Sequence, residues 1–150
     1  MPTSDPDFAQ RVRDSFDRQA AMRTLGASLD SIEPGHVVIG MRHRDELTQQ
    51  HGFIHAGMLA AALDSACGYA AFSLMPAGAA VLTIEFKINL LAPARGPRLR
   101  LDAQVTKAGR TISVVDGRAM QTEADGSDEK LIATMTATVM TVVGRDGIHH

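Results

Sequence analysis

The chain has 150 residues, a length that fits one domain of ordinary size. Lys and Arg total 15 against 17 Asp and Glu, so the composition gives no support for nucleic-acid binding. A single Cys excludes an internal disulfide and a cysteine-based zinc site, and it suits a reducing, cytoplasmic setting. Aromatic residues are 4% with no Trp, so we expect an aliphatic core that gains from a partner surface.

The chain shows no internal repeat, low-complexity tract or linker that would divide it into several domains. We expect an N-terminal helical segment over residues 1–26, one folded domain over residues 27–143 and a short tail over residues 144–150. The N-terminal segment is charged and lacks the apolar run of a signal peptide.

The first predicted element is a helix over residues 7–25. Phe8, Val12 and Phe16 recur every four residues among charged side chains, which is typical of an amphipathic helix. Gly26 is placed to end it, because glycine readily adopts the left-handed conformation that closes many helices.

Strand patterning follows over residues 27–42. The turn residues at 33–35 break it, so this stretch is either a strand pair or one long bent strand. A polar loop is expected next, over residues 45–54.

The longest apolar stretch covers residues 53–75. It is long enough to span a bilayer, but Asp64 near its centre would cost about 2.5–3.5 kcal/mol there. We therefore predict no membrane segment and a buried helix over residues 56–74 instead, apolar on nearly every face and closed by the turn at Pro76.

Beyond this helix the apolar period changes to two. From Leu82 to Leu90 the even-numbered residues are apolar and alternate with Thr83 and other polar residues, which predicts a half-buried strand. Short turns favour antiparallel pairing, so the fold class is α+β, with an antiparallel sheet wrapped around the long helix. The strands are expected over residues 81–91, 98–105, 111–122 and 131–143, with turns at residues 93–97, 108–110 and 124–128.

Two features of the predicted helix could carry chemistry. Asp64 is the one charged residue within it, and a carboxylate on an apolar helix is costly unless it is paired or functional. The helix start at Ala56 and Gly57 offers backbone N–H groups that can polarise a carbonyl.

Asp64 follows His55 by nine residues, roughly 13 Å along the axis and on the opposite face of the helix. One helix therefore cannot aim both features at the same carbonyl. Two copies with antiparallel helices could, which favours a dimer with active sites at its interface.

Residues 49–57 read Gln-Gln-His-Gly-Phe-Ile-His-Ala-Gly, and Asp64 comes seven residues after Gly57. This pattern resembles hotdog-fold acyl-CoA thioesterases of the phenylacetate-degradation (PaaI-like) type, which typically show His-Gly-Gly before the acidic residue. Ala56 replaces the first Gly, but it keeps its backbone N–H. The resemblance covers most of the chain, from about Leu25 to Met140.

The resemblance implies a role for each matching residue. Asp64 would act as general base on water or as nucleophile on the thioester carbonyl, which the N–H groups of Ala56 and Gly57 would polarise. Gln49 would lie near the thioester, His55 would position the thioester or the leaving thiolate, and Thr83 would orient the attacking water.

The resemblance also implies how the substrate binds. Arg95 and the turn at Gly109 and Arg110 are where contacts to the CoA phosphates are expected. CoA is part of the substrate, so no separate cofactor and no metal are expected. The family is dimeric at its active site and often tetrameric, which agrees with the spacing argument.

Other interpretations of single residues stay open. Asp64 could be a structural carboxylate capped by hydroxyls such as that of Ser65. Cys67 could be a nucleophile, although a lone Cys among Ala and Gly is more often a small buried apolar residue. His51 and His55 have a spacing that metals use on a helix, but no third ligand accompanies them. The depth of the pocket is expected to depend on residues from both subunits, such as Met58, Tyr69, Phe72 and Phe86.

Two other functions are compatible with the fold. One is hydration or dehydration of an acyl thioester, which commonly uses a His–acid pair that this sequence lacks at the required spacing. The other is a non-catalytic acyl-CoA sensor or carrier. Sensors normally carry a DNA-binding module, and the first 25 residues are too short and too weakly basic for one.

Overall fold

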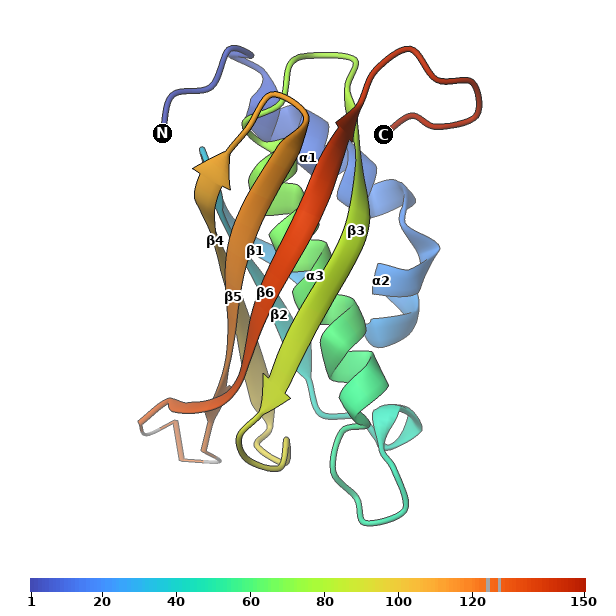
Figure 1. Ribbon diagram of the computed structural model, residues 1–150. Helices are drawn as coiled ribbons and strands as arrows, with labels where there is room; N and C mark the ends of the chain where they lie inside the picture. The colour runs from blue at the N-terminus through green and yellow to red at the C-terminus, as the bar shows by residue number, and fades with distance from the viewer. Residues whose placement is uncertain (124, 127) are drawn as a thin grey trace.

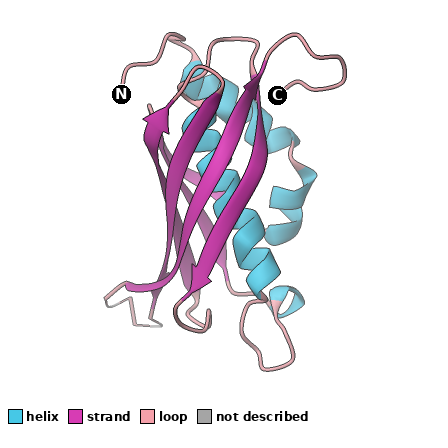
Figure 2. Cartoon of the chain, in the orientation of Figure 1, coloured by secondary structure: helices cyan, strands magenta, loops and turns pink. Residues whose placement is uncertain are grey.

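The computed structural model describes residues 1–123, 125–126 and 128–150. Within them, a six-stranded antiparallel sheet curls around one long helix (Figures 1 and 2). Two positions of the predicted turn at residues 124–128, Ala124 and Ser127, lie outside the described residues. The sheet order is β1-β2-β4-β5-β6-β3. The elements are α1 (Phe8–Arg18), α2 (Ala20–Leu25), β1 (Ser28–Glu33), β2 (His36–Arg42), the short 3₁₀ helix η1 (Asp45–Leu47), α3 (Ala56–Phe72), β3 (Ala80–Leu90), β4 (Arg98–Ala108), β5 (Ile112–Thr122) and β6 (Lys130–Val142).

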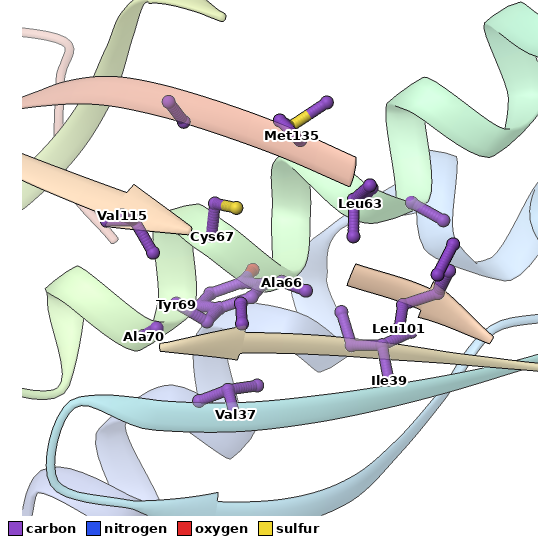
Figure 3. Close-up of a cluster of buried hydrophobic side chains, with 14 of the residues drawn as sticks. Val37, Ile39, Leu63, Ala66, Cys67, Tyr69, Ala70, Leu101, Val115 and Met135 are labelled. Carbon is purple, nitrogen blue, oxygen red and sulfur yellow. The ribbon is translucent and has the colours of Figure 1, made fainter. Parts of the chain in front are cut away.

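Helix α3 lies in the concave face of the sheet, and its small side chains let the strands approach closely. Figure 3 shows Leu63 and Cys67 among apolar side chains from the strands. A Cβ on Gly117 of β5 would lie 2.9 Å from the Cys67 sulfur, so glycine is needed there for this packing. The predicted helix is two residues too long, because α3 ends at Phe72 in a tight turn before Pro76.

The single helix predicted over residues 7–25 is wrong. The chain forms α1 and α2, separated by Gln19, whose backbone is extended with φ −82° and ψ 100°. The side chain of Gln19 bonds to α3, as described below, and this tertiary contact overrides the local helical pattern. Gly26 ends α2 in the left-handed conformation, as predicted.

The regular alternation predicted for β3 is interrupted by a β-bulge between Thr83 and Glu85. Because directly opposite residues in an antiparallel pair point to the same face, pairing with β6 fixes the side of each residue. Thr83 pairs with the buried Val139 and faces α3, whereas Leu82 faces outward. Beyond the bulge the register is reversed, and Phe86 and the later even-numbered residues face α3.

Strand β3 forms one edge of the sheet, beside α3 (Figure 1). The sequence predicts half-buried apolar residues here, but Ile84 is 51% exposed, Phe86 41% and Leu90 54%. The edge strand extends past the surface that α3 covers, so this apolar strip has no cover within the described chain. In addition, no described helix is long and apolar enough to cross a membrane.

Candidate active site

Asp64 and Thr83 face each other between α3 and β3. The Thr83 hydroxyl donates a hydrogen bond of 2.8 Å to Oδ1 of Asp64. Burial raises the pKa of Asp64 above its ordinary value, and the hydrogen bond from Thr83 opposes that rise. Among the described residues Asp64 forms no ion pair. The site therefore holds a lone, half-buried carboxylate with one oxygen fixed and a raised proton affinity, as a general base requires.

A cavity of about 460 Å³ opens at Asp64. Polar side chains from α1, the α1–α2 break and α3 form much of its wall, and β3 and the C-terminal tail supply the rest. The lining residues are Ser15, Arg18, Gln19, Asp64, Ser65, Gly68, Tyr69, Val81, Leu82, Thr83, His149 and His150.

The start of α3 holds a second set of polar groups. His55 is the N-cap residue, and its Nδ1 accepts a hydrogen bond of 2.8 Å from the backbone N–H of Gly57. A neutral imidazole that accepts at Nδ1 carries its proton on Nε2, a donor with no partner among the residues that the structure describes. A Cβ on Gly57 would lie 3.1 Å from Nδ1, so glycine leaves room for the ring.

The two N–H groups predicted to polarise a carbonyl differ in this structure. The N–H of Gly57 is already donated to His55, so Gly57 could serve a substrate only if that hydrogen bond opened. The N–H of Ala56 has no hydrogen-bond partner among the described residues, and Ala56 is exposed. Ala56 is therefore the donor that is available at the positive end of α3.

A second cavity, of about 530 Å³, lies at this end of α3 and is mainly apolar. Gln49 lines it, and its side-chain oxygen accepts a 2.6 Å hydrogen bond from the N–H of His51, which shapes the preceding loop. The other lining residues are Gln50, Phe53, Ile54, His55, Ala56, Leu59, Leu90, Leu91, Ala92, Pro93 and Ala94.

The two cavities share no lining residue. Within one chain, the carboxylate of Asp64 and the free N–H of Ala56 therefore open into different spaces. The structure brings Asp64 together with Thr83, and it brings Gln49 together with His55 and Ala56, but it does not join the two groups.

Residues 51–125, half of the chain, match the family model described as Thioesterase superfamily. The chain belongs to the thioesterase superfamily. A Halobacterium salinarum protein named "putative esterase" is 31% identical to it over 127 residues, which cover 81% of this chain and 83% of that protein. Membership of the thioesterase superfamily and these names support a thioester hydrolase.

Solved structures confirm the predicted hotdog fold. A thioesterase family protein from Silicibacter pomeroyi has a TM-score of 0.89 and 55% identity, covering 91% of this chain and 99% of that one. The PaaI protein from the phenylacetic acid degradation operon of E. coli has a TM-score of 0.80 at 23% identity, covering 92% and 95%. This member of the thioesterase superfamily therefore shares its fold with PaaI.

The three residues expected to contact the CoA phosphates do not lie together, because one is at one end of the sheet and the other two are at the opposite end. Arg95 is exposed in the β3–β4 connection, next to the cavity at the start of α3. Gly109 and Arg110 lie in the β4–β5 turn, at the far end of β4. A Cβ on Gly109 would collide with the carbonyl oxygen of Ile112, so the turn itself requires this glycine.

The structure does not support the other roles considered for single residues of this chain: a cysteine nucleophile, a capped structural carboxylate and a metal site. Cys67 is fully buried against Gly117, and burial raises the pKa of its thiol, so it is not a nucleophile. Ser65 does not cap Asp64, since its hydroxyl donates to Gln19 instead. The described residues contain no group of three or more His, Cys, Asp or Glu that could hold a metal ion.

Sequence reasoning missed part of the Asp64 cavity. Of the expected pocket residues, Tyr69 does line it, whereas Phe72 is buried in the core, and Met58 and Phe86 are exposed and line neither of the two cavities. Gln19 was missed because it lies in an apparently continuous helical pattern, where a polar residue indicates only a solvated face.

Proposed function

We propose that this chain hydrolyses acyl-CoA thioesters to the free acid and CoA, with Asp64 as the reacting carboxylate. The observation that supports it most is the lone half-buried carboxylate of Asp64, oriented by Thr83 in an open cavity. A buried charge without a partner destabilises the fold, and its presence here is explained by chemistry.

The reaction needs a polarised carbonyl and an attacking oxygen. The N–H of Ala56 donates to the thioester carbonyl oxygen and stabilises the negative charge that develops there. As general base, Asp64 takes a proton from water, whose oxygen attacks the carbonyl carbon, and the C–S bond then breaks. As nucleophile, Asp64 attacks the same carbon to form a mixed anhydride, which water hydrolyses. In both routes CoA leaves as a thiolate, with Nε2–H of His55 placed to donate to it and Gln49 beside the thioester.

A complete site is proposed to form between two chains. The carboxylate and the free N–H open into separate cavities, and a two-fold axis with antiparallel α3 helices would bring Asp64 of one chain to Ala56 of the other. The uncovered apolar strip on edge strand β3 supplies a surface for such a partner. The proposed assembly is a homodimer, two of which could pair into a tetramer.

The CoA nucleotide is proposed to bind at the mouth of the cavity at the start of α3. Arg95 lies beside that cavity and carries a positive charge suited to a phosphate. Arg110 and Gly109 lie at the other end of the sheet, which is the end that an antiparallel partner would bring nearer. Arg95→Gln is expected to raise KM for acyl-CoA more than it lowers kcat.

The direct test is release of free thiol from a panel of short, long and aromatic acyl-CoAs. Asp64→Asn is expected to keep the fold and to lose about 10²–10⁴-fold in kcat. Asp116→Asn is the matched control, because Asp116 accepts hydrogen bonds from Thr106 and Thr136 and lines neither proposed half-site. Hydrolysis by the Asp64 variant at the wild-type rate would disprove the mechanism. Binding of several acyl-CoAs without turnover by the wild type would favour an acyl-CoA sensor or carrier.

The shared site has a separate test. Asp64→Asn chains and Ala56→Pro chains each lack one half of the site, since proline has no N–H to donate. Proline is tolerated at the first position of a helix, so α3 should still form. Co-expressed chains are expected to recover about a quarter of wild-type activity, because half the dimers are mixed and each mixed dimer holds one complete site. No recovery in confirmed mixed dimers would show that each chain works alone.

A further inference from the structure

The break between α1 and α2 has no cause in the local sequence. Residues 17–21 read Asp-Arg-Gln-Ala-Ala, with no glycine or proline, and Gln and Ala are good helix formers. A sharp interruption of a helix without proline or glycine needs another cause. The cause here is the side chain of Gln19, which turns inward to α3.

The side-chain amide of Gln19 forms hydrogen bonds through both its nitrogen and its oxygen. Its Nε2 donates a 2.9 Å hydrogen bond to the Tyr69 hydroxyl, and its Oε1 accepts a 3.1 Å hydrogen bond from Ser65. Tyr69 in turn shares a 3.1 Å hydrogen bond with the buried hydroxyl of Ser15. The second N–H on Nε2 has no partner among the described residues, so the network retains one donor.

This network forms a wall of the cavity that holds Asp64. Gln19, Ser15, Ser65 and Tyr69 all line the same space of about 460 Å³. Ser65 is next to Asp64 in the chain, and Tyr69 lies five residues after Asp64, about 7.5 Å along the helix. A group that extends from a carbonyl at Asp64 therefore passes hydroxyl and amide groups on this wall, with Val81 and Leu82 of β3 also lining the cavity.

We propose that Gln19 determines which acyl group the cavity accepts, and that it selects acyl groups with a neutral hydroxyl remote from the thioester. An unsubstituted alkyl chain would displace water from the free N–H of Gln19 without offering it another acceptor, which is costly. A hydroxyl accepts from the free N–H of Gln19 and avoids this penalty. The inference rests on the proposed function only in placing the acyl group in this cavity.

The test measures binding separately from turnover. Non-hydrolysable CoA thioethers with alkyl chains of about four to eight carbons, with and without a terminal hydroxyl, span the length of the wall. Calorimetric titration gives the affinity ratio of each matched pair. Wild type is expected to bind the hydroxylated member about tenfold more tightly at one chain length. Gln19→Met is expected to reduce that ratio to about one, with the plain chain bound at least as tightly as by the wild type.

Two further variants make the result specific. Gln10→Met is the matched control, because Gln10 lies on the exposed face of α1, bonds to Asp14 and does not line this cavity. It should leave the ratio unchanged. Gln19→Leu is a second apolar replacement that loses both N–H donors, so it should lower the ratio even if the Met variant does not fold.

Each outcome decides the proposal. A wild-type ratio near one at every length, an equal loss for both members in the Gln19 variants, or a ratio that these variants leave unchanged would overturn it. A hydroxyl preference in binding without hydrolysis of any acyl-CoA would contradict the proposed function and support this inference. Hydrolysis of acyl-CoAs without any hydroxyl preference in binding would support the proposed function and overturn this inference.

Discussion

Thr83 hydrogen-bonds to Asp64 across the space between β3 and α3, and it faces that way because β3 bulges at the next residue. In the register that continues beyond the bulge, even-numbered residues face α3, so an unbulged strand in that register would point Thr83 outward. The bulge therefore places a hydroxyl, rather than an apolar side chain, opposite the carboxylate. Bulges often aim a side chain at a functional site in this way.

Removing the Thr83 hydroxyl should impair the reaction without unfolding the chain. Thr83→Val keeps the shape of the side chain but loses the donor that fixes Oδ1 of Asp64, and kcat is expected to fall roughly five- to tenfold. Thr83→Ser keeps the donor and should stay within about twofold of wild type. Thiol-release kinetics at a fixed pH compare the three proteins. Equal rates for the Val and Ser variants would show that the hydrogen bond has no role in turnover.

Activity should depend on the ionisation of Asp64. The carboxylate is the active form in both proposed routes, so hydrolysis is lost as the pH falls through the pKa of Asp64. Burial raises that pKa, and the acid limb of kcat/KM is therefore expected above the ordinary aspartate value of 3.8. Thr83→Val removes the hydrogen bond that lowers the pKa, so the limb should move to still higher pH. An acid limb at the same pH in Thr83→Val as in the wild type would show that a group other than Asp64 causes it.

Asp64→Asn should stabilise the protein while it inactivates it. Because the folded-state pKa is raised above the unfolded value, charging Asp64 disfavours the folded state at pH values above both pKa values. Asparagine is neutral and its oxygen can still accept from Thr83. A melting temperature higher by on the order of 2 °C is expected at pH 7. The gain should vanish near pH 3, where Asp64 is protonated in both states, and a gain independent of pH would contradict this explanation.

The edge strand β3 should govern assembly. Ile84→Lys places a positive charge on the exposed apolar strip, and a two-fold pair through this strip would have to bury two such charges. The variant is expected to be monomeric by light scattering and to lose at least about tenfold in activity per chain. Ile112→Lys is the control, since Ile112 is similarly exposed on β5, two strands from this edge. A dimeric and active Ile84 variant would place the interface elsewhere.

The parts of the fold that follow local periodicity were predictable from the sequence. The four later strands and the helix that they surround all appear, because alternation and helical spacing are visible within each segment, whereas the choice between a strand pair and one bent strand over residues 27–42 was left open and is decided by the pairing of β1 with β2. In the same way, Asp64 stands out as a lone charge in an apolar run, and its separation from His55 follows from helix geometry alone.

The parts that depend on contacts between segments were not predictable. No residue near Gln19 predicts a break, since its cause lies on α3, more than 40 residues away. The bulge at Ile84 interrupts an unbroken alternation and is fixed only by the pairing with β6. Likewise, the sequence motif treats Ala56 and Gly57 alike, and the hydrogen bond to His55 distinguishes them.

In the proposed dimer, the separation of the two cavities would make protein concentration a control on the reaction. Within one chain the carboxylate of Asp64 and the helix start at Ala56 open into different spaces, so a dissociated chain would hold no complete site. Dilution would then switch off hydrolysis with no loss of structure, and re-concentration would restore it. Specific activity should rise with concentration, reach half of its maximum near the dissociation constant of the dimer and level off well above it, so an activity titration measures the strength of the interface.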